Sequence, residues 1–345
     1  MSLESFIRAM PKVELHVHME GSIRPETLLK LARRHGVKLL ADTVEGLRAW
    51  YNFTDFPHFV EVYIAISNCL RSPDDIELIA REFLSGQAAQ NIRYSEVTYT
   101  AITMHIQNRI PFADQLAALN RARRWAEAEL GVSMGLVIDI PREVRPDQGL
   151  LVADWAISGF GEGVVAFGLG GLEVGHPPEK FKAAFDRARA AGLPSVPHAG
   201  ETVGPESIWG ALTTLHADRI GHGVRCLEDP ALVAELRARQ IPLEICPTSN
   251  VCLKVAPSLA EHPLPQLLAE GLVVTLNSDD PPMFNTTLTG EYLAVAETFN
   301  FDLDTIEHLV LNGVRAALLP ADTRRQMEAD FIAEFARLRS QYFGV

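Results

Sequence analysis

Two histidines stand two residues apart in the segment ELHVH, at the end of an apolar, strand-like run. Residues two apart on a strand point to the same face, so His16 and His18 can reach one ion. The same pair is also compatible with two structural histidines at a strand end, because a lone HxH occurs often by chance. The pair therefore predicts a metal site only if further ligands meet it in space.

Three further motifs offer such groups. PHAGE contains His198 and Glu201, RIGHG contains His222, and LNSDDP contains Asp279 and Asp280. Each motif alone could be structural: a buried histidine, a helix cap or an aspartate pair in a turn. Three imidazoles and a carboxylate together suit zinc or another borderline divalent ion, with one position left for water. Such an ion lowers the pKa of its water towards neutrality, so the set predicts a metal-dependent hydrolase.

The elements that must position these residues form a repeating pattern of strand-like run and helix-like stretch. Eight such runs predict strands at 13–18, 92–98, 132–140, 164–169, 194–198, 219–222, 241–246 and 272–277. Eight parallel strands with crossover helices indicate an α/β fold, a (β/α)₈ TIM-type barrel, in which functional side chains come from the C-terminal strand ends. All the motifs lie at those ends. An open doubly wound sheet would require a glycine-rich loop after its first strand, where this chain has HVHMEGS.

Helices are predicted at 179–191 and 230–240, and the stretch 19–90 is long enough for several, one of them at 25–35 and closed by Gly36. We expect these extra helices after the first strand to cover the barrel mouth. There, Phe53, Phe56 and Phe59 either line an apolar pocket for a flat ring or pack between helices. With no low-complexity tract or linker, residues 1–345 are expected to form a single barrel domain.

Composition narrows the classes of partner. The chain is 47% hydrophobic and 22% charged, with no apolar run long enough for a bilayer, so no membrane partner is expected. The N-terminus lacks signal-peptide character, which predicts a cytoplasmic protein. A net charge of −13 argues against nucleic-acid binding and favours a small-molecule partner. The four cysteines form no CxxC pair and are expected to be reduced, buried thiols.

The motifs MPKVELHVHMEGSIRPETL, HAGE, RIGHG and NSDDP, in this order, resemble the adenosine deaminase family. The resemblance runs from about Pro11 to the C-terminal helices and implies the same (β/α)₈ fold. It implies one Zn²⁺ per chain, bound by His16, His18, His198 and Asp279. It also implies hydrolytic removal of the 6-amino group of an adenosine-like purine nucleoside, giving an inosine-type product and ammonia.

The resemblance also assigns catalytic roles. Glu201 would protonate purine N1 while hydroxide attacks C6, and His222 would orient or deprotonate the metal-bound water. Protonation of N1 withdraws electron density from C6, so the pKa of Glu201 should lie well above its ordinary value. Asp280 would hydrogen-bond N7, unless it only serves the turn, and the backbone of Gly171 would contact N3.

The exact substrate is less constrained. The resemblance implies that adenine-acting members tend to carry aspartate where Gly221 stands, and the segments CPTSNVCL and DDPPMFNTTL resemble the nucleoside-acting branch. Glu20 occupies a position where many adenosine deaminases have aspartate near the ribose 5′ end. The longer Glu20 could reach the same hydroxyl or could suit a nucleoside altered at its 5′ carbon, such as aminodeoxyfutalosine of menaquinone biosynthesis.

Parts of the sequence are also compatible with other functions. Adenine is a further candidate substrate, and a non-catalytic protein that binds metal or nucleoside is an alternative of another class. Loss of Glu201 or of a ligand would mark such a protein, and none is lost. A nucleic-acid deaminase would pair HxE with PCxxC, and this pair of motifs does not occur. No motif in the sequence indicates a particular oligomeric state.

Overall fold

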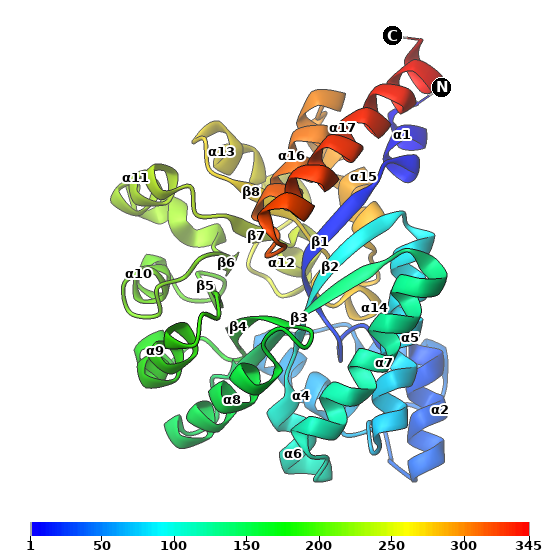
Figure 1. Cartoon of the computed structure of the whole chain (residues 1–345), viewed down its shortest axis with the longest axis vertical. Coiled ribbons are helices and arrows are strands. Elements are labelled where there is room, and N and C mark those ends of the chain that lie inside the picture. Colours follow the sequence, from blue (N-terminus) through cyan, green and yellow to red (C-terminus); the bar gives the residue numbers. More distant parts are fainter. Residues whose placement is uncertain (1, 345) are drawn as a thin grey trace.

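The computed structural model describes residues 2–344 and contains one eight-stranded sheet in the order β1 to β8, with each consecutive pair parallel. β8 returns to β1 through a parallel bridge between Asp279 and Val17, so the sheet curls into a barrel (Figure 1). The predicted (β/α)₈ fold is confirmed. The strands are β1 (Lys12–His18), β2 (Ile92–Tyr99), β3 (Ser133–Pro141), β4 (Val164–Gly170), β5 (Ser195–Ala199), β6 (Ile220–His222), β7 (Leu243–Ile245) and β8 (Val274–Leu276).

Every predicted strand coincides with an observed one, although β7 and β8 are shorter than predicted. A side chain completes the closure where the backbone pairing of β8 stops. Asn277 Oδ1 accepts hydrogen bonds from the backbone N–H groups of Leu15 and His16, at 2.8 and 3.1 Å. The end of β8 is thereby fixed against the strand that carries the HxH pair.

Helices surround the barrel and also cover one of its ends. The helix predicted at 25–35 is observed there, and Gly36 ends it in the left-handed conformation at φ 64°. The segment predicted as one helix at 179–191 is instead a 3₁₀ turn followed by an α-helix, separated near Phe181. The helices between the strands begin with α1 (Leu3–Ala9), α2 (Pro25–His35), α3 (Val44–Trp50), α4 (Phe56–Ser67), α5 (Pro73–Ala89), α6 (Ala101–Asn108), α7 (Phe112–Leu130), α8 (Pro146–Gly159), η1 (Pro178–Phe181) and α9 (Lys182–Ala190).

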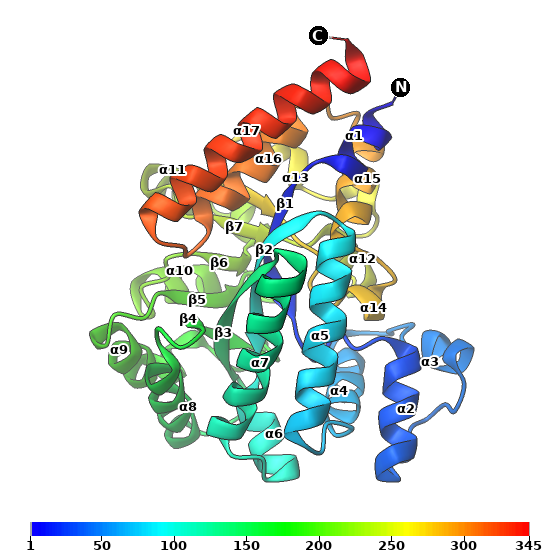
Figure 2. The same ribbon diagram turned by 45° about the vertical axis from the view of Figure 1, so that its right-hand side comes forward.

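The second half of the chain continues the same alternation. Figure 2 shows α2, α3, α4 and α6 at the end of the molecule opposite the two termini, with α17 crossing near the termini. The remaining helices are α10 (Pro205–Thr213), η2 (Val224–Glu228), α11 (Pro230–Arg239), α12 (Pro247–Cys252), η3 (Leu259–Glu261), α13 (Leu264–Ala269), α14 (Pro281–Phe284), α15 (Leu288–Phe299), α16 (Leu303–Ala316) and α17 (Ala321–Phe343). Among residues 2–344, no helix is both long and apolar enough to cross a membrane.

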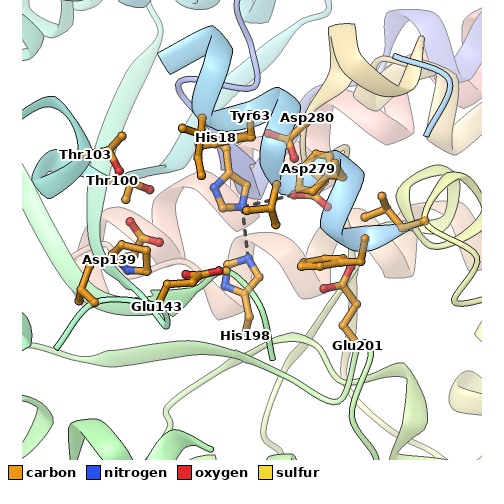
Figure 3. A pocket seen from close by; sticks show the side chains of 18 of the residues that line it. His18, Tyr63, Thr100, Thr103, Asp139, Glu143, His198, Glu201, Asp279 and Asp280 are labelled. Atoms are coloured by element: carbon orange, nitrogen blue, oxygen red, sulfur yellow. Dashed lines mark hydrogen bonds and ion pairs between the residues drawn. The ribbon is translucent and has the colours of Figure 1, made fainter. Parts of the chain in front are cut away.

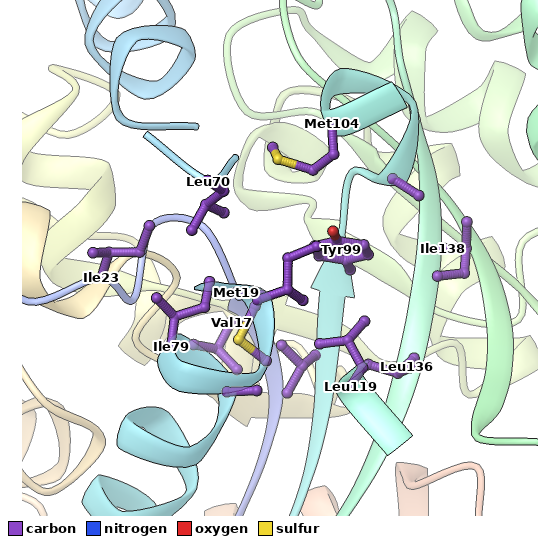
Figure 4. Packing of buried hydrophobic residues seen from close by; sticks show 14 of the residues in the cluster. Val17, Met19, Ile23, Leu70, Ile79, Tyr99, Met104, Leu119, Leu136 and Ile138 are labelled. Atoms are coloured by element: carbon purple, nitrogen blue, oxygen red, sulfur yellow. The ribbon is translucent and has the colours of Figure 1, made fainter. Parts of the chain in front are cut away.

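Alternation along the strands separates the apolar core from the polar barrel interior. Val17 of β1, Tyr99 of β2 and Ile138 of β3 belong to one buried apolar cluster (Figure 4). Their neighbours His18 and Asp139 point the other way and line the pocket described below. This period of two is what a strand requires when one face packs on helices and the other faces the barrel axis.

The cysteines are free thiols, as the sequence predicts. Cys69, Cys226 and Cys246 are buried, whereas Cys252 is only half-buried. Burial raises the pKa of the Cys246 thiol well above its ordinary value, followed in importance by the charge of Asp279. Cys246 lies beside His16 and Asp279, and its Sγ donates to the backbone carbonyl oxygen of Glu244 at 3.7 Å.

Candidate active site

The structure brings together the four residues predicted to bind metal. His16 and His18 come from β1, His198 from β5, and Asp279 from the turn after β8. His18 Nε2 lies 3.2 Å from His198 Nε2 and 3.3 Å from Asp279 Oδ1, and His16 Nε2 lies 3.5 Å from Asp279 Oδ1. Figure 3 shows His18, His198 and Asp279 converging in the same pocket.

The spacing of these atoms fits a tetrahedral ion. Two ligand atoms each about 2.05 Å from a tetrahedral zinc ion lie about 3.3 Å apart. His16 Nε2 is buried and has no hydrogen-bond partner among the described residues, although it faces this cluster. An imidazole nitrogen left unpaired beside a carboxylate and two other imidazoles is what a metal ion would satisfy. The donor set of nitrogen and oxygen atoms therefore fits a borderline divalent cation.

Two hydrogen bonds orient the imidazoles. His16 Nδ1 lies 2.8 Å from Glu244 Oε2 on β7, and His198 Nδ1 lies 2.8 Å from the carbonyl oxygen of Leu169 on β4. In each ring, an Nδ1–H donated to oxygen leaves the Nε2 lone pair for an ion. Glu244 was not foreseen from the sequence, because nothing near it in the chain marks it as a partner of His16.

The charges in the cluster favour a cation. Burial lowers the pKa of His18 to about 4, and it lowers that of His198 well below the ordinary value. Burial opposes charging of His16 too, but the nearby Asp279 carboxylate and the hydrogen-bonded Glu244 outweigh that effect and raise the pKa to about 10. Burial likewise opposes ionisation of Asp279, yet its contact with His16 holds its pKa well below the usual range. Positive charge is thus stabilised at the centre of the cluster.

The neighbouring aspartates serve different sides of the site because the chain turns between them. Asp279 has φ 64°, a left-handed conformation uncommon outside glycine, and its Oδ2 accepts a 2.7 Å hydrogen bond from Ser249. Asp280 lines the pocket with a buried Oδ1 that has no partner among residues 2–344. Burial and the nearby charge of Asp279 raise the pKa of Asp280 well above its ordinary value. Gly21 lies so close to Asp280 that a Cβ there would be 1.5 Å from Oδ1.

Glu201 lies beside the cluster in the same pocket. It is 5% exposed, and its Oε1 has no hydrogen-bond partner in the described part of the chain. Burial raises the pKa of Glu201 well above its ordinary value, and the charges of Asp279 and Glu173 add to the effect. A carboxyl group kept protonated in this way can donate a proton near neutral pH.

A second carboxylate holds the loop that carries Glu201. Glu173, in the loop after β4, accepts hydrogen bonds from the backbone N–H groups of four consecutive residues, 200–203, at 2.7 to 3.2 Å. Glu173 was not predicted from the sequence. Its only sequence signal is its place just beyond the end of a predicted strand.

His222 completes the catalytic pair predicted from the sequence. Its Nε2 lies 3.7 Å from Glu201 Oε1 and 3.9 Å from Asp279 Oδ2, and its Nδ1 lies 3.4 Å from Asn250 Nδ2. The first two distances exceed direct hydrogen bonds but suit groups that share one bridging oxygen. Burial lowers the pKa of His222 to about 4, so the ring is neutral and able to accept a proton.

The predicted substrate-binding residues divide into two groups. Gly171, Phe56, Phe59 and Asp280 line the pocket, which spans about 1050 Å³ including its open mouth. Glu20 does not line it: Glu20 is fully buried and accepts hydrogen bonds from the backbone N–H of Thr100 and the hydroxyl of Tyr63, both at 3.0 Å. Phe53 lies behind Phe59, with ring centres 5.3 Å apart, and packs as a core residue. Glu20 thus supports the pocket wall through two residues that do line it.

Comparison with known proteins identifies the family. The sequence profile described as "Adenosine deaminase" matches residues 11–334. The chain belongs to the adenosine deaminase family. Aminodeoxyfutalosine deaminase of Streptomyces avermitilis is 42% identical over 95% of this chain and 92% of its own length. Adenine deaminase of Crocosphaera subtropica is 36% identical over 94% of this chain and 99% of its own.

Solved structures of family relatives agree with the fold. Adenine deaminase of Arthrobacter aurescens superposes with a TM-score of 0.91 at 34% identity, covering 95% of this chain and 100% of the other. A Burkholderia ambifaria amidohydrolase with bound zinc superposes with a TM-score of 0.91 at 29% identity, covering 99% and 95%. The chain is therefore a deaminase that hydrolyses the amino group of an adenine-like substrate.

Proposed function

We propose that this family member is a zinc-dependent aminohydrolase of a purine nucleoside extended at its 5′ carbon, with aminodeoxyfutalosine as the favoured substrate. The observation that carries this proposal is the shape of the pocket. It continues from the histidine cluster to a wide apolar mouth formed by α4 and α6, where Ile64 is 48% and Ile106 is 52% exposed. A free base bound at the histidine cluster would leave the exposed apolar side chains of the mouth uncovered, whereas an extension beyond the sugar would cover them.

His16, His18, His198 and Asp279 are the residues that would hold the ion. A bound Zn²⁺ supplies Lewis acidity that makes water nucleophilic at neutral pH. Zinc in a 29% identical relative and the mixed imidazole and carboxylate donor set support this choice of metal.

The residues of the chain supply the proton transfers and the positioning. Glu201, held protonated by burial, donates its proton to purine N1 as the oxygen nucleophile adds to C6. Neutral His222 orients that nucleophile or accepts its proton. Asp280 contacts N7 through the oxygen that has no other partner among the described residues. Gly171, at φ 85°, presents its backbone to N3 where a Cβ would approach Glu143 Oε2 to 2.5 Å.

Adenine is the second candidate substrate. Its support is the 36% to 41% identity to adenine deaminases over 86% to 97% of this chain. Against it stand the exposed apolar mouth of the pocket and Gly221, whose missing side chain makes room for the His16 ring: a Cβ there would lie 2.8 Å from His16 Cε1. An aspartate at this position requires a shift of the His16 ring.

The test is a steady-state comparison of aminodeoxyfutalosine, 5′-methylthioadenosine, adenosine and adenine on zinc-loaded protein. We expect kcat/KM to be highest for aminodeoxyfutalosine and at least 100-fold lower for adenine, an order-of-magnitude expectation. The variant Ile106→Asp should reduce kcat/KM for the extended nucleoside more than for adenosine, because only the extension reaches the mouth. A higher kcat/KM for adenine than for every nucleoside would overturn the proposal.

A further inference from the structure

Asp139, near the end of β3, is a buried carboxylate in the pocket that no catalytic role uses. It is 2% exposed, lines the pocket, and has an Oδ1 without a hydrogen-bond partner among the described residues. Burial raises the pKa of Asp139 to about 7, although the Thr100 side chain opposes this by hydrogen bonding. A buried acceptor left unpaired is costly, so a donor from a ligand would be stabilising.

The neighbouring strand is shaped around Asp139. Asp139 pairs in register with Gly168 of β4, and Gly170 follows two residues later on the same face. A Cβ on Gly168 would lie 3.1 Å from the Cβ of Asp139, and one on Gly170 would lie 2.9 Å from Asp139 Oδ2. Side chains at either position would press on the carboxylate. The two glycines therefore leave the space that the buried Asp139 carboxylate occupies in the pocket wall.

Asp139 lies away from the groups that act on the purine. In Figure 3, Asp139, Thr100, Thr103 and Glu143 gather on one side of His18 and His198, whereas Glu201 lies on the other. All of these residues line the same pocket. A purine held between Glu201 and Asp280 therefore leaves its substituent to meet a different set of polar groups.

Glu20 is not available for that contact. Its two carboxylate oxygens are already engaged by the Thr100 N–H and the Tyr63 hydroxyl, and its side chain is fully buried outside the pocket lining. Asp139 Oδ1, by contrast, has no donor among the described residues. A hydroxyl group matches Asp139 Oδ1, since it donates a hydrogen bond without placing negative charge directly against Asp139 and Glu143.

We propose that Asp139 is a specificity residue that accepts a hydrogen bond from a ribose hydroxyl of the substrate through Oδ1. This inference rests on the proposed nucleoside specificity. Asp139 then distinguishes nucleosides from the free base, which has no hydroxyl to offer. With the 5′ carbon extended, the 2′ and 3′ hydroxyls are the donors that remain.

The test crosses substrate changes with changes at residue 139. We measure kcat/KM of zinc-loaded protein for adenosine, 2′-deoxyadenosine and 3′-deoxyadenosine. Wild-type protein should favour adenosine over at least one deoxy analogue by about 10- to 100-fold, the range for a hydrogen bond to a charged group. In Asp139→Ala this ratio should shrink to below about threefold, because the partner of the missing hydroxyl is gone.

Two further variants keep the comparison decisive. Asp139→Asn retains the shape and a neutral acceptor, which is about half as strong, so its ratio should fall to about the square root of the wild-type ratio. It also serves if Asp139→Ala fails to fold or to bind zinc. Asp154→Asn, an exposed aspartate on α8 paired with Arg187, is the matched control and should keep the wild-type ratio.

The outcomes separate this inference from the proposed function. A wild-type protein that turns over adenosine but discriminates against neither analogue overturns the role of Asp139. So does a wild-type ratio that persists in Asp139→Ala or, where that variant does not fold, in Asp139→Asn. A wild-type protein that deaminates only adenine overturns the nucleoside specificity itself.

Discussion

At the scale of single residues, the site depends on polar atoms that are buried and unpaired. His16 Nε2, Glu201 Oε1, Asp280 Oδ1 and Asp139 Oδ1 all lack hydrogen-bond partners among residues 2–344. Folded proteins satisfy nearly all such atoms, and each exception calls for a ligand or a catalytic reason. His16 Nε2 faces the histidine cluster, and the other three atoms belong to residues that line the pocket.

Glu201→Gln tests the proton donor. The substitution preserves shape but removes the acidic proton, so we expect kcat to fall by about three orders of magnitude or more, as general acid catalysis contributes on that scale. Zinc content, measured by metal analysis, should remain about one per chain because Glu201 is not among the proposed ligands. Glu206→Gln, an exposed glutamate five residues on, is the control and should retain activity. Turnover near the wild-type value in Glu201→Gln would remove this residue from the mechanism.

At the scale of elements, the sequence predicts much of the fold because each strand carries its own signal. Alternation of His16, Val17 and His18 marks both the strand and its inward face, and the eight strands follow from eight such runs. Contacts between distant segments have no such signal. Glu244 contacts His16 from 228 residues away, and Glu173 lies next to the backbone N–H groups of residues 200–203 because β4 and β5 are neighbours in the sheet.

Glu20 is a further residue whose contacts could not be predicted from the sequence. Its motif places it correctly after β1, but the direction of its side chain depends on α4 and on the segment that begins α6. There it joins the end of β1 to Tyr63 and Thr100. The sequence therefore points to Glu20 as a residue near the site. It does not indicate the contacts of Glu20, because these arise from the packing of three separate elements.

The substitution Glu20→Gln should change how the free energy of unfolding depends on pH. Burial, with the nearby charge of Asp139, raises the pKa of Glu20 to about 8 from 4.5. Between these values the unfolded chain has released this proton while the folded chain keeps it, so the wild-type free energy of unfolding falls as pH rises from 4.5 to 8. Glutamine removes this contribution. The stability of the variant relative to wild type should therefore increase across that window.

Urea unfolding followed by circular dichroism at pH 5, 6.5 and 8, with equal zinc, measures this difference. Glu26→Gln on α2 alters an exposed carboxylate near by and should give a curve parallel to wild type. If the Glu20→Gln curve were also parallel to wild type, Glu20 would be ionised in the folded protein and its burial would not control its protonation.

At the scale of the whole molecule, a line of buried charges connects the active site to the body of the barrel. Arg219, 1% exposed, donates to Glu244 on β7 at 2.6 Å and to Glu96 on β2 at 2.5 Å. It also donates to the carbonyl oxygen of Ala316 at the end of α16, at 2.9 Å. Glu244 in turn contacts His16 on β1. One guanidinium thereby links strands on different sides of the barrel to the helix layer and to a proposed metal ligand.

Arg219→Met tests whether this line holds the barrel together. Methionine fills much of the space but leaves Glu96 and Glu244 as buried carboxylates without their cation, which costs about 3 to 5 kcal/mol when one partner of a buried ion pair is removed. We expect the free energy of unfolding, from urea titration, to fall by that amount. Burial would then act on Glu244 without the cation that opposes it, so its pKa should rise from its present lowered value.

A second substitution distinguishes lost charge from lost packing. In Arg219→Met combined with Glu96→Gln, one of the two stranded charges is neutralised, and part of the lost stability should return, because the penalty comes from uncompensated charge. Arg237→Met, an exposed arginine paired with Glu270, is the control and should change stability by less than about 1 kcal/mol. Equal losses in the single and double variants would show that the volume and shape of Arg219, and not its charge, stabilise the barrel.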